Sequence, residues 1–384
     1  MNSIDTITTL FGYFIYMACF IYSYSINWSK CNWFAIISFI IIIGFRGCGL
    51  DYFGYKELFD ALIRLDLTVK TMFDEEVFVG SGIKFELAYL FIIRIISYFS
   101  HSSIWFFSFI AALQIIPLDK FIRKHFQCQR ERMFIAFMFF VSLIFLEVFN
   151  GMRQFATYLL WINTVIFIVE KNFIKYTLCI AILYLFHSSA LMLWPLYFVI
   201  DKKFLKNKTI IIFSYLLFIL LSNEFIGILS ALMDSAYLLI EGTDVIRSQY
   251  LQSDEQEKIL SRSALVYIFR ISTFLYLIMT SDKLYNKYGN FGVVFFNLTI
   301  VGYFLQELAF NMGVYRLNYY FYYNVFVSMA LALECNFDRI NNIIPKYMNI
   351  YNYYIVFLYL LWFANCVMKE AGGCAPYVLS KELF

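Results

Sequence analysis

Apolar runs about as long as a lipid bilayer is thick recur along almost the whole chain, and "WFAIISFIIII" (33–43) is one of them. A helix needs about 20 mainly apolar residues to cross the hydrocarbon layer, and somewhat fewer where flanking side chains reach the interface. Lipid offers no partner to free backbone polar groups, and no segment alternates as a barrel strand does. The sequence therefore predicts an all-α, polytopic bundle of transmembrane helices.

Composition supports this interpretation. Of the 384 residues, 62% are hydrophobic and 15% are charged, and the mean hydropathy is +0.70, whereas soluble domains carry roughly a quarter charged residues. The net charge of +3 gives no reason to expect nucleic acid as a partner. The eight cysteines are scattered without a C-x-x-C pair, which predicts neither a disulfide framework nor a metal site.

Hydropathy predicts 11 to 13 membrane elements in a single integral membrane domain that covers residues 1–384. The segment 174–200 is either one tilted helix or a hairpin broken at "FHSSALMLWP", which contains His187. Two insertions look extracytoplasmic, at about 46–84 and 223–262. The remaining predicted spans lie near 6–24, 32–45, 85–99, 103–118, 133–149, 153–169, 208–222, 263–281, 290–310, 317–335 and 349–367.

Short loops rich in Lys and Arg mark the cytoplasmic side of a membrane protein. The most basic loops here are 119–132, 170–175, 201–208 and 281–287. Placing them inside puts 150–153, 223–262 and 311–316 outside and favours the hairpin for 174–200. A conflict remains, because counting back from 119–132 through two spans places 46–84 inside, whereas Lys30 in an inner loop places it outside. Either one predicted element before residue 120 is wrong, or part of 46–84 re-enters the membrane.

Charged residues near membrane depth are costly, so each is a candidate for function. The stretch "GFRGCGLDYFGYKELF" (44–59) places Arg46 and Asp51 on a glycine-rich turn. Glycine tolerates positive φ and allows a ligand to approach the backbone closely. Tyr52 and Tyr55 follow on one face of an amphipathic helix. The alternative is an interfacial helix that Asp51 merely caps.

Further along the chain, Glu86 opens an apolar helix in "KFELAYLF", where a carboxylate that answers the helix dipole is the ordinary interpretation. Arg153 and Gln154 begin another helix after an Asn-Gly turn. Because that turn is predicted to lie outside, where positive charge is disfavoured, Arg153 is a functional candidate. His187, at a break in an apolar run, is either a structural or a catalytic histidine.

The last cluster is "LQELAFNMGVYRLNYYFYYNVF", where Arg316 lies on an outer turn among tyrosines that include Tyr320. Arg316 and two earlier arginines, Arg46 and Arg153, thus stand beside turns at the membrane ends. A guanidinium stays charged and directs two donors onto phosphate oxygens. If the three converge outside, a diphosphate is the natural ligand, and a nearby carboxylate or imidazole can act as general base on a hydroxyl.

Taken in order, these motifs resemble the EpsG family of exopolysaccharide proteins, a branch of the Wzy-type polysaccharide polymerases. The resemblance rests on "FRGCGLDYFGYKELF", "FELAYLF", "MRQFAT", "FHSSAL" and "YRLNYYF", which together cover roughly residues 30–330. One departure is "FELAY", in which Leu87-Ala88 replaces the usual glycine after Glu86.

The resemblance implies a GT-C-like glycosyltransferase of the bacterial inner membrane with its active site facing the periplasm. Such enzymes join undecaprenyl-diphosphate-linked oligosaccharides into O-antigen (lipopolysaccharide), capsule or exopolysaccharide, alongside a flippase and a chain-length regulator. Carried onto this chain, Arg153 and Arg316, with Arg46, would hold the diphosphate, and Asp51 or His187 would be the general base. We favour Asp51, because it lies in the longest motif. No cofactor or metal is expected, because no nucleotide-sugar, D-x-D or ATPase motif is present.

Three alternatives stay open at this point. One is a GT-C transferase that uses a polyprenyl-phosphate sugar, which needs fewer arginines. Another is a flippase or other transporter of lipid-linked oligosaccharides, although neither an internal repeat nor many mid-helix charges are present. The third is a purely structural membrane protein.

Overall fold

The computed structural model describes residues 3–26, 31–64, 86–203, 207–221, 264–312, 315–337 and 346–383. In these ranges every regular element is a helix, and the one isolated β-bridge joins Arg46 and Leu379. The prediction of an all-α protein is therefore confirmed. The predicted insertion 223–262 and residues 65–84 of the other insertion lie outside the described residues.

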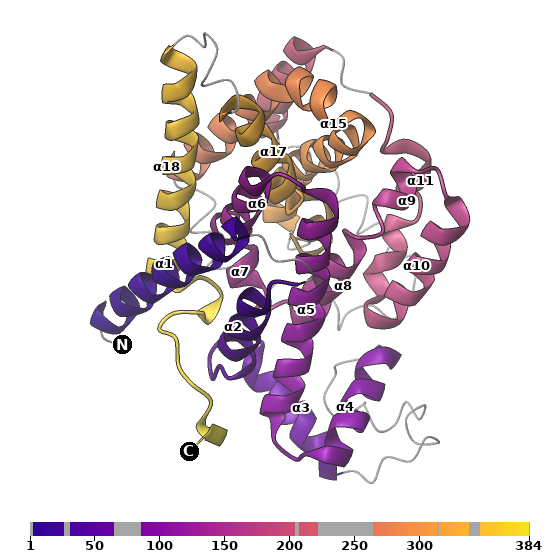
Figure 1. The fold of residues 1–384 in the computed structure, drawn as a ribbon, viewed down its shortest axis with the longest axis vertical. Coiled ribbons are helices and arrows are strands. Elements are labelled where there is room, and N and C mark those ends of the chain that lie inside the picture. Colours follow the sequence, from indigo (N-terminus) through magenta and orange to yellow (C-terminus); the bar gives the residue numbers. More distant parts are fainter. Residues whose placement is uncertain are drawn as a thin grey trace. The chain divides into compact units, whose positions relative to one another are not determined.

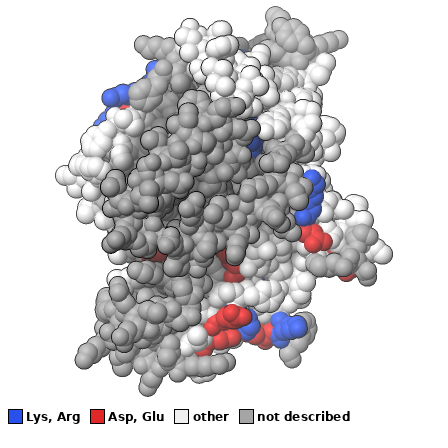
Figure 2. Space-filling model, turned by 180° about the vertical axis from the view of Figure 1, so that it is seen from behind, with Lys and Arg blue, Asp and Glu red and all other residues white. Residues whose placement is uncertain are grey.

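Five helices in the described part are long and apolar enough to cross a membrane: Ile4–Ser25, Ser103–His125, Met152–Val169, Ala264–Glu307 and Ile350–Met368. The chain is thus a multi-pass membrane protein. On the face in Figure 2, the described side chains are mostly uncharged, and the charged ones occupy a few small areas. Large apolar side chains such as Phe11, Ile15 and Tyr98 are more than 60% exposed, as expected for a surface that faces lipid.

The described helices form two compact units: unit 1 comprises Met1–Tyr197 with Leu360–Phe384, and unit 2 comprises Phe198–Tyr359. Each is described by itself, and the single domain predicted for 1–384 stays a prediction. The elements of unit 1 (Figure 1) are α1 (Ser3–Ser25), α2 (Trp33–Gly44), α3 (Tyr52–Arg64), α4 (Leu87–Phe99), α5 (Ser103–His125), α6 (Gln129–Val141), α7 (Ile144–Glu147), α8 (Met152–Trp161), α9 (Ile166–Val169), α10 (Phe173–Phe186), η3 (Ser188–Leu193), the end of α18 (Lys346–Met368), η5 (Ala371–Gly373) and η6 (Lys381–Leu383); α11 (Leu196–Val199) lies at the boundary between the units.

The segment predicted at 174–200 is a broken hairpin, which confirms one of the two alternatives. The helix α10 ends at His187, whose backbone is extended (φ −158°, ψ 122°). The chain then returns along α10, so that the hydroxyl of Tyr176 donates to the carbonyl of Leu193 at 2.7 Å and the indole of Trp194 donates to Thr177 at 3.1 Å. His187 therefore lies at the bend.

The predicted span at 85–99 corresponds to the helix α4 (Leu87–Phe99). Its 13 residues extend about 20 Å, which is less than the roughly 30 Å of a bilayer core. It begins beside Arg153, which contacts Glu86, and it ends just before Ser102, which opens α5. The conflict in the orientation count disappears if α4 does not cross the membrane.

The helices α3, α4 and α5 and the start of α8 share one apolar core. Its buried members include Phe59 of α3, Tyr89 of α4, Phe106 of α5 and Met152 of α8. The rings of Phe59 and Phe106 stack with their centroids 5.7 Å apart. Close packing of these aromatic side chains holds together helix ends that are far apart in the sequence.

Unit 2 contains α15 (Ala264–Met312), α16 (Tyr315–Tyr322), α17 (Val325–Phe337), the start of α18 and a helix at Lys208–Leu221. The long α15 is broken at Gly289 (φ 54°) and folds back on itself, so that Tyr303 donates to Thr273 at 2.7 Å. This confirms that the spans predicted at 263–281 and 290–310 are separate helices. The predicted loop 281–287 is helical instead.

Candidate functional site

Four side chains from four separate motifs meet at one place in unit 1. They are Tyr55 on α3, Glu86 immediately before α4, Arg153 at the start of α8 and His187 at the bend of the α10 hairpin. We call these four residues the polar cluster. Three of them immediately precede or begin a helix or lie at a break between helices, where the chain turns at the edge of the apolar core.

Arg153 contacts two other members of the polar cluster, Tyr55 and Glu86. Its Nε donates to the hydroxyl of Tyr55 at 2.8 Å, and its Nη1 lies 2.5 Å from Oε2 of Glu86. The guanidinium also stands over the Tyr55 ring, 5.8 Å from its centroid, which is within cation–π range. The side chain is only 16% exposed. These contacts fix the plane of the guanidinium in a mostly buried position.

Glu86 bridges the arginine and the histidine. It occupies the N-cap position of α4, but its side chain makes no capping hydrogen bond. Instead, Oε1 lies 2.6 Å from Nδ1 of His187 and accepts from the backbone N–H of Ser188 at 3.4 Å. Burial opposes ionisation of this carboxyl, but the hydrogen bond to His187 and the charge of Arg153 outweigh it and lower its pKa. A carboxylate accepts from Nδ1–H, which leaves Nε2 as the basic nitrogen of His187.

The phenol of Tyr55 stays protonated in this setting. Burial raises its pKa above the ordinary value, the guanidinium of Arg153 opposes this rise, and the carboxylates of Asp51 and Glu86 add to it. Asp51 lies one helical turn before Tyr55, and its carbonyl accepts the N–H of Tyr55 at 3.1 Å. The cluster thus combines a fixed guanidinium, a protonated phenol and a carboxylate–imidazole pair, a set that can bind an anion and remove a proton.

A known family matches nearly the whole length of the chain. The EpsG family matches residues 29–379. The chain belongs to the EpsG family. No curated protein and no solved structure matches the chain. Membership in the EpsG family, together with the membrane helices, supports a polymerase-type role in polysaccharide biosynthesis at a membrane.

Arg46 lies apart from the polar cluster and is fully buried. Its guanidinium donates to the backbone carbonyls of Ile43 and, at 2.9 Å, Phe149. The rings of Phe107 and Phe149 flank it, with centroids 5.2 and 5.3 Å away. In this arrangement Arg46 joins α2 to the loop before α8. The prediction that it contacts a diphosphate gains no support from these contacts.

The glycines around Arg46 allow other parts of the chain to pack closely against the turn. A Cβ on Gly44 would lie 2.3 Å from the hydroxyl oxygen of Ser108, and one on Gly47 would lie 2.7 Å from the carbonyl oxygen of Leu379. Gly49 has φ of +110°, which a residue with a Cβ rarely adopts. The glycine-rich turn therefore serves close packing against α5 and the C-terminal residues.

The remaining predicted site residues lie elsewhere. Tyr52 is buried, stacks on Phe107 with a centroid distance of 4.8 Å and contacts Ser380, and Gln154 is buried next to Arg153. Tyr320 is buried in unit 2. Arg316 lies in α16 of unit 2, and its side chain is outside the described residues.

Two groups of polar residues were not predicted as partners. In unit 2, Arg270 and Glu307 form a buried ion pair at 3.1 Å, which Tyr215 joins. In unit 1, Lys56 and Glu382 form an ion pair. Sequence periodicity does not predict the contact between Glu382 and α3, because the two are separated by more than 300 residues along the chain. Among the described residues, no group of His, Cys, Asp and Glu side chains could hold a metal ion.

Proposed function

We propose that the chain is a polysaccharide polymerase that joins undecaprenyl-diphosphate-linked oligosaccharide units on the periplasmic face of the bacterial inner membrane. One observation carries the proposal: residues from four EpsG-like motifs form one chain of contacts, in which Tyr55 contacts Arg153, Arg153 contacts Glu86 and Glu86 contacts His187. This combination supplies both an anion ligand and a general base, the two groups that glycosyl transfer from a lipid diphosphate needs.

In the proposed reaction, a hydroxyl of the acceptor unit attacks the anomeric carbon of the growing chain. The bond from that carbon to the diphosphate oxygen breaks, and undecaprenyl diphosphate leaves as an anion. Arg153 stabilises the charge on the leaving diphosphate. His187 takes the hydroxyl proton on Nε2, while Glu86 holds Nδ1 and stabilises the imidazolium that forms.

His187 is the base that the contacts favour over Asp51. Its ring is paired with a carboxylate at 2.6 Å, the arrangement that orients a general base. Asp51 precedes α3 and influences the cluster through Tyr55. We therefore assign the proton transfer to His187 and an electrostatic role to Asp51.

The test is deletion of the gene in its host followed by complementation, with the surface polysaccharide resolved by size. Loss of a polymerase leaves single exported units without a ladder, whereas loss of a flippase leaves no exported units. A transferase that uses a polyprenyl-phosphate sugar would instead leave units that lack a sugar.

Variants then locate the site. Arg153→Ala and Arg153→Lys should both fail to restore the ladder, because lysine cannot donate through two parallel N–H groups. Arg94→Lys is the matched control, since Arg94 lies on α4 about 12 Å along the helix from Glu86. Full-length ladders from Arg153→Ala at normal protein levels would show that the site is wrong.

A further inference from the structure

Residues near the C-terminus lie along the glycine-rich turn that follows α2. The N–H of Gly47 donates to the carbonyl of Val378 at 2.7 Å, and the N–H of Ser380 donates to the carbonyl of Phe45 at 2.8 Å. These bonds flank the isolated bridge between Arg46 and Leu379. Residues 372–382, here called the C-terminal strap, are thereby fixed to the entry of α3.

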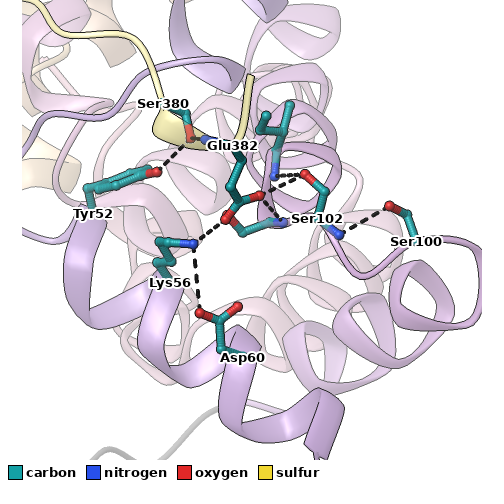
Figure 3. A network of polar contacts seen from close by, with 9 residues as sticks. Tyr52, Lys56, Asp60, Ser100, Ser102, Ser380 and Glu382 are labelled. Atoms are coloured by element: carbon teal, nitrogen blue, oxygen red, sulfur yellow. Dashed lines mark hydrogen bonds and ion pairs between the residues drawn. The ribbon is translucent and has the colours of Figure 1, made fainter. Parts of the chain in front are cut away.

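Glu382 closes the strap onto two helices (Figure 3). Its carboxylate accepts from the hydroxyl of Ser102 at 2.7 Å, and from the N–H of Ser103 at 2.9 Å and its hydroxyl at 2.8 Å. These donors belong to the beginning of α5, where a negative charge is stabilised by unpaired N–H groups. The same carboxylate pairs with Lys56 of α3, which also lies 3.7 Å from Asp60. One side chain thus links α3 to α5.

The strap contacts α3 through residues one turn apart. The hydroxyls of Tyr52 and Ser380 lie 3.1 Å apart, and Lys56 follows Tyr52 by four residues on the same helix face. Tyr55 projects from the same turn to Arg153. A 13-residue helix has little stability by itself, so its rotation and depth are set by such external contacts.

We propose that Glu382 is a positioning residue, which fixes the rotation of α3 and so holds the Tyr55 hydroxyl at the guanidinium of Arg153. This inference rests on the proposed function, because it assigns the strap a role at the same site. Glu382 acts through Lys56 and α3 rather than by touching the substrate. Loss of its carboxylate lets α3 rotate and loosens the Tyr55–Arg153 hydrogen bond.

The test is a double-mutant cycle on the purified protein, with polymerisation of lipid-diphosphate-linked units as the readout. Tyr55→Phe and Glu382→Gln should each lower kcat about tenfold, the loss expected for one hydrogen bond to a charged group, with little change in KM. The combined variant should be no slower than the slower single variant, because both remove the same interaction. Losses that multiply to about a hundredfold, or a Glu382→Gln variant as fast as the unchanged protein, would overturn the inference.

Controls separate positioning from folding. Glu370→Gln changes another acidic residue near the C-terminus, which accepts from Thr6 on α1 at 3.3 Å and should leave kcat unchanged. If Glu382→Gln reduces the amount of inserted protein, Lys56→Gln serves in the same cycle, since it breaks the link from the α3 side. If Arg153→Ala polymerises normally, the proposed function fails; if Arg153→Ala is inactive and the cycle is additive, only the positioning role fails.

Discussion

Glu86 has two carboxylate oxygens, and each serves a different partner. Oε2 faces Arg153 and Oε1 faces His187, so that one side chain sets the position of both the guanidinium and the imidazole. Its side chain is 15% exposed, and an uncompensated charge at such a site is costly. The three side chains therefore form one coupled unit.

Replacing Glu86 by Gln should inactivate the protein more than it destabilises it. The amide keeps the size of the side chain but removes the charge that pairs with Arg153 and orients His187. We expect polymerisation to fall about 100-fold, within the range that general acid–base catalysis contributes. The measurement is the rate of chain growth at equal amounts of protein. Glu57→Gln, on an exposed residue of α3, is the control and should match the unchanged protein.

Among the elements of unit 1, the C-terminal strap and the turn before α3 depend on each other. Gly47 lies so close to Leu379 and Ser380 that a Cβ would approach backbone atoms of both, at 2.7 and 3.2 Å. A methyl group at this position must displace backbone rather than a flexible side chain. Close packing of the strap therefore requires glycine at position 47.

Gly47→Ala should destabilise the protein by about 1–3 kcal/mol, as overpacking of close-packed sites does. Gly54→Ala provides the contrast, because Gly54 lies inside α3 with nothing within 4 Å of a new Cβ. There alanine should be neutral or stabilising by up to about 1 kcal/mol. Thermal unfolding in detergent measures both. Equal midpoints for the two variants would contradict the close packing of the strap.

The ion pair of Glu382 makes docking of the strap sensitive to acid. Burial raises the pKa of this carboxyl, but the hydrogen bonds from Lys56, Ser102 and Ser103 outweigh it and lower the pKa from 4.5 to about 2. A carboxyl whose pKa is lowered on folding stabilises the folded state above its unfolded pKa and loses that contribution as the pH falls through its folded pKa.

The unfolding midpoints of the unchanged protein and of Glu382→Gln should therefore differ by a constant amount above about pH 5. The difference should narrow between pH 4.5 and about 2, as the carboxyl of the unchanged protein takes up its proton. Lys56 stays charged over this range, and all other acidic residues are the same in both proteins, so the comparison isolates Glu382. A difference that persists undiminished to about pH 2 would contradict this account.

For unit 1 as a whole, α5 separates two chemically distinct ends. Its 23 residues extend about 35 Å, enough to cross a bilayer. The end with Ser102 contacts the strap, and the other end carries Arg123, Lys124 and His125, which belong to the basic segment 119–132; that predicted loop is helical except at 126–128. Positive charge favours the cytoplasm for the second end, and on this basis we propose that the polar cluster and the strap lie outside.

Cysteine labelling tests this orientation. In a background with Cys19, Cys31, Cys128 and Cys179 replaced by serine, a membrane-impermeant thiol reagent should label Lys381→Cys in intact cells from which the outer membrane has been removed. Arg130→Cys should react only after the inner membrane is opened. Both positions are exposed in the structure, so failure to react reports the membrane barrier rather than burial. Labelling of both from the same side would contradict the proposed orientation.

Much of the architecture was predictable from local sequence. The all-helical fold, the break at His187 and the separation of the helices at 263–281 and 290–310 follow from apolar runs and from the residues that interrupt them. Arg153 was singled out because it follows an Asn-Gly turn on the side where positive charge is disfavoured. These sequence patterns can be interpreted segment by segment, because lipid requires every spanning segment to satisfy its own backbone hydrogen bonds.

Contacts between distant segments were decided only by the tertiary structure. Arg46 and Arg153 each come two residues after a glycine, at a turn. Arg46 is nevertheless enclosed by backbone carbonyls and aromatic rings, whereas Arg153 contacts Tyr55 and Glu86. Glu86 resembled a simple helix-start carboxylate until its partners were known. The role of Glu382 depends on pairing over more than 300 residues, which no periodicity encodes. The sequence by itself determined that the chain is a protein of membrane helices, because that depends on its hydropathy. Only the packing of the helix ends in the tertiary structure decided which charged residues lie together in one site.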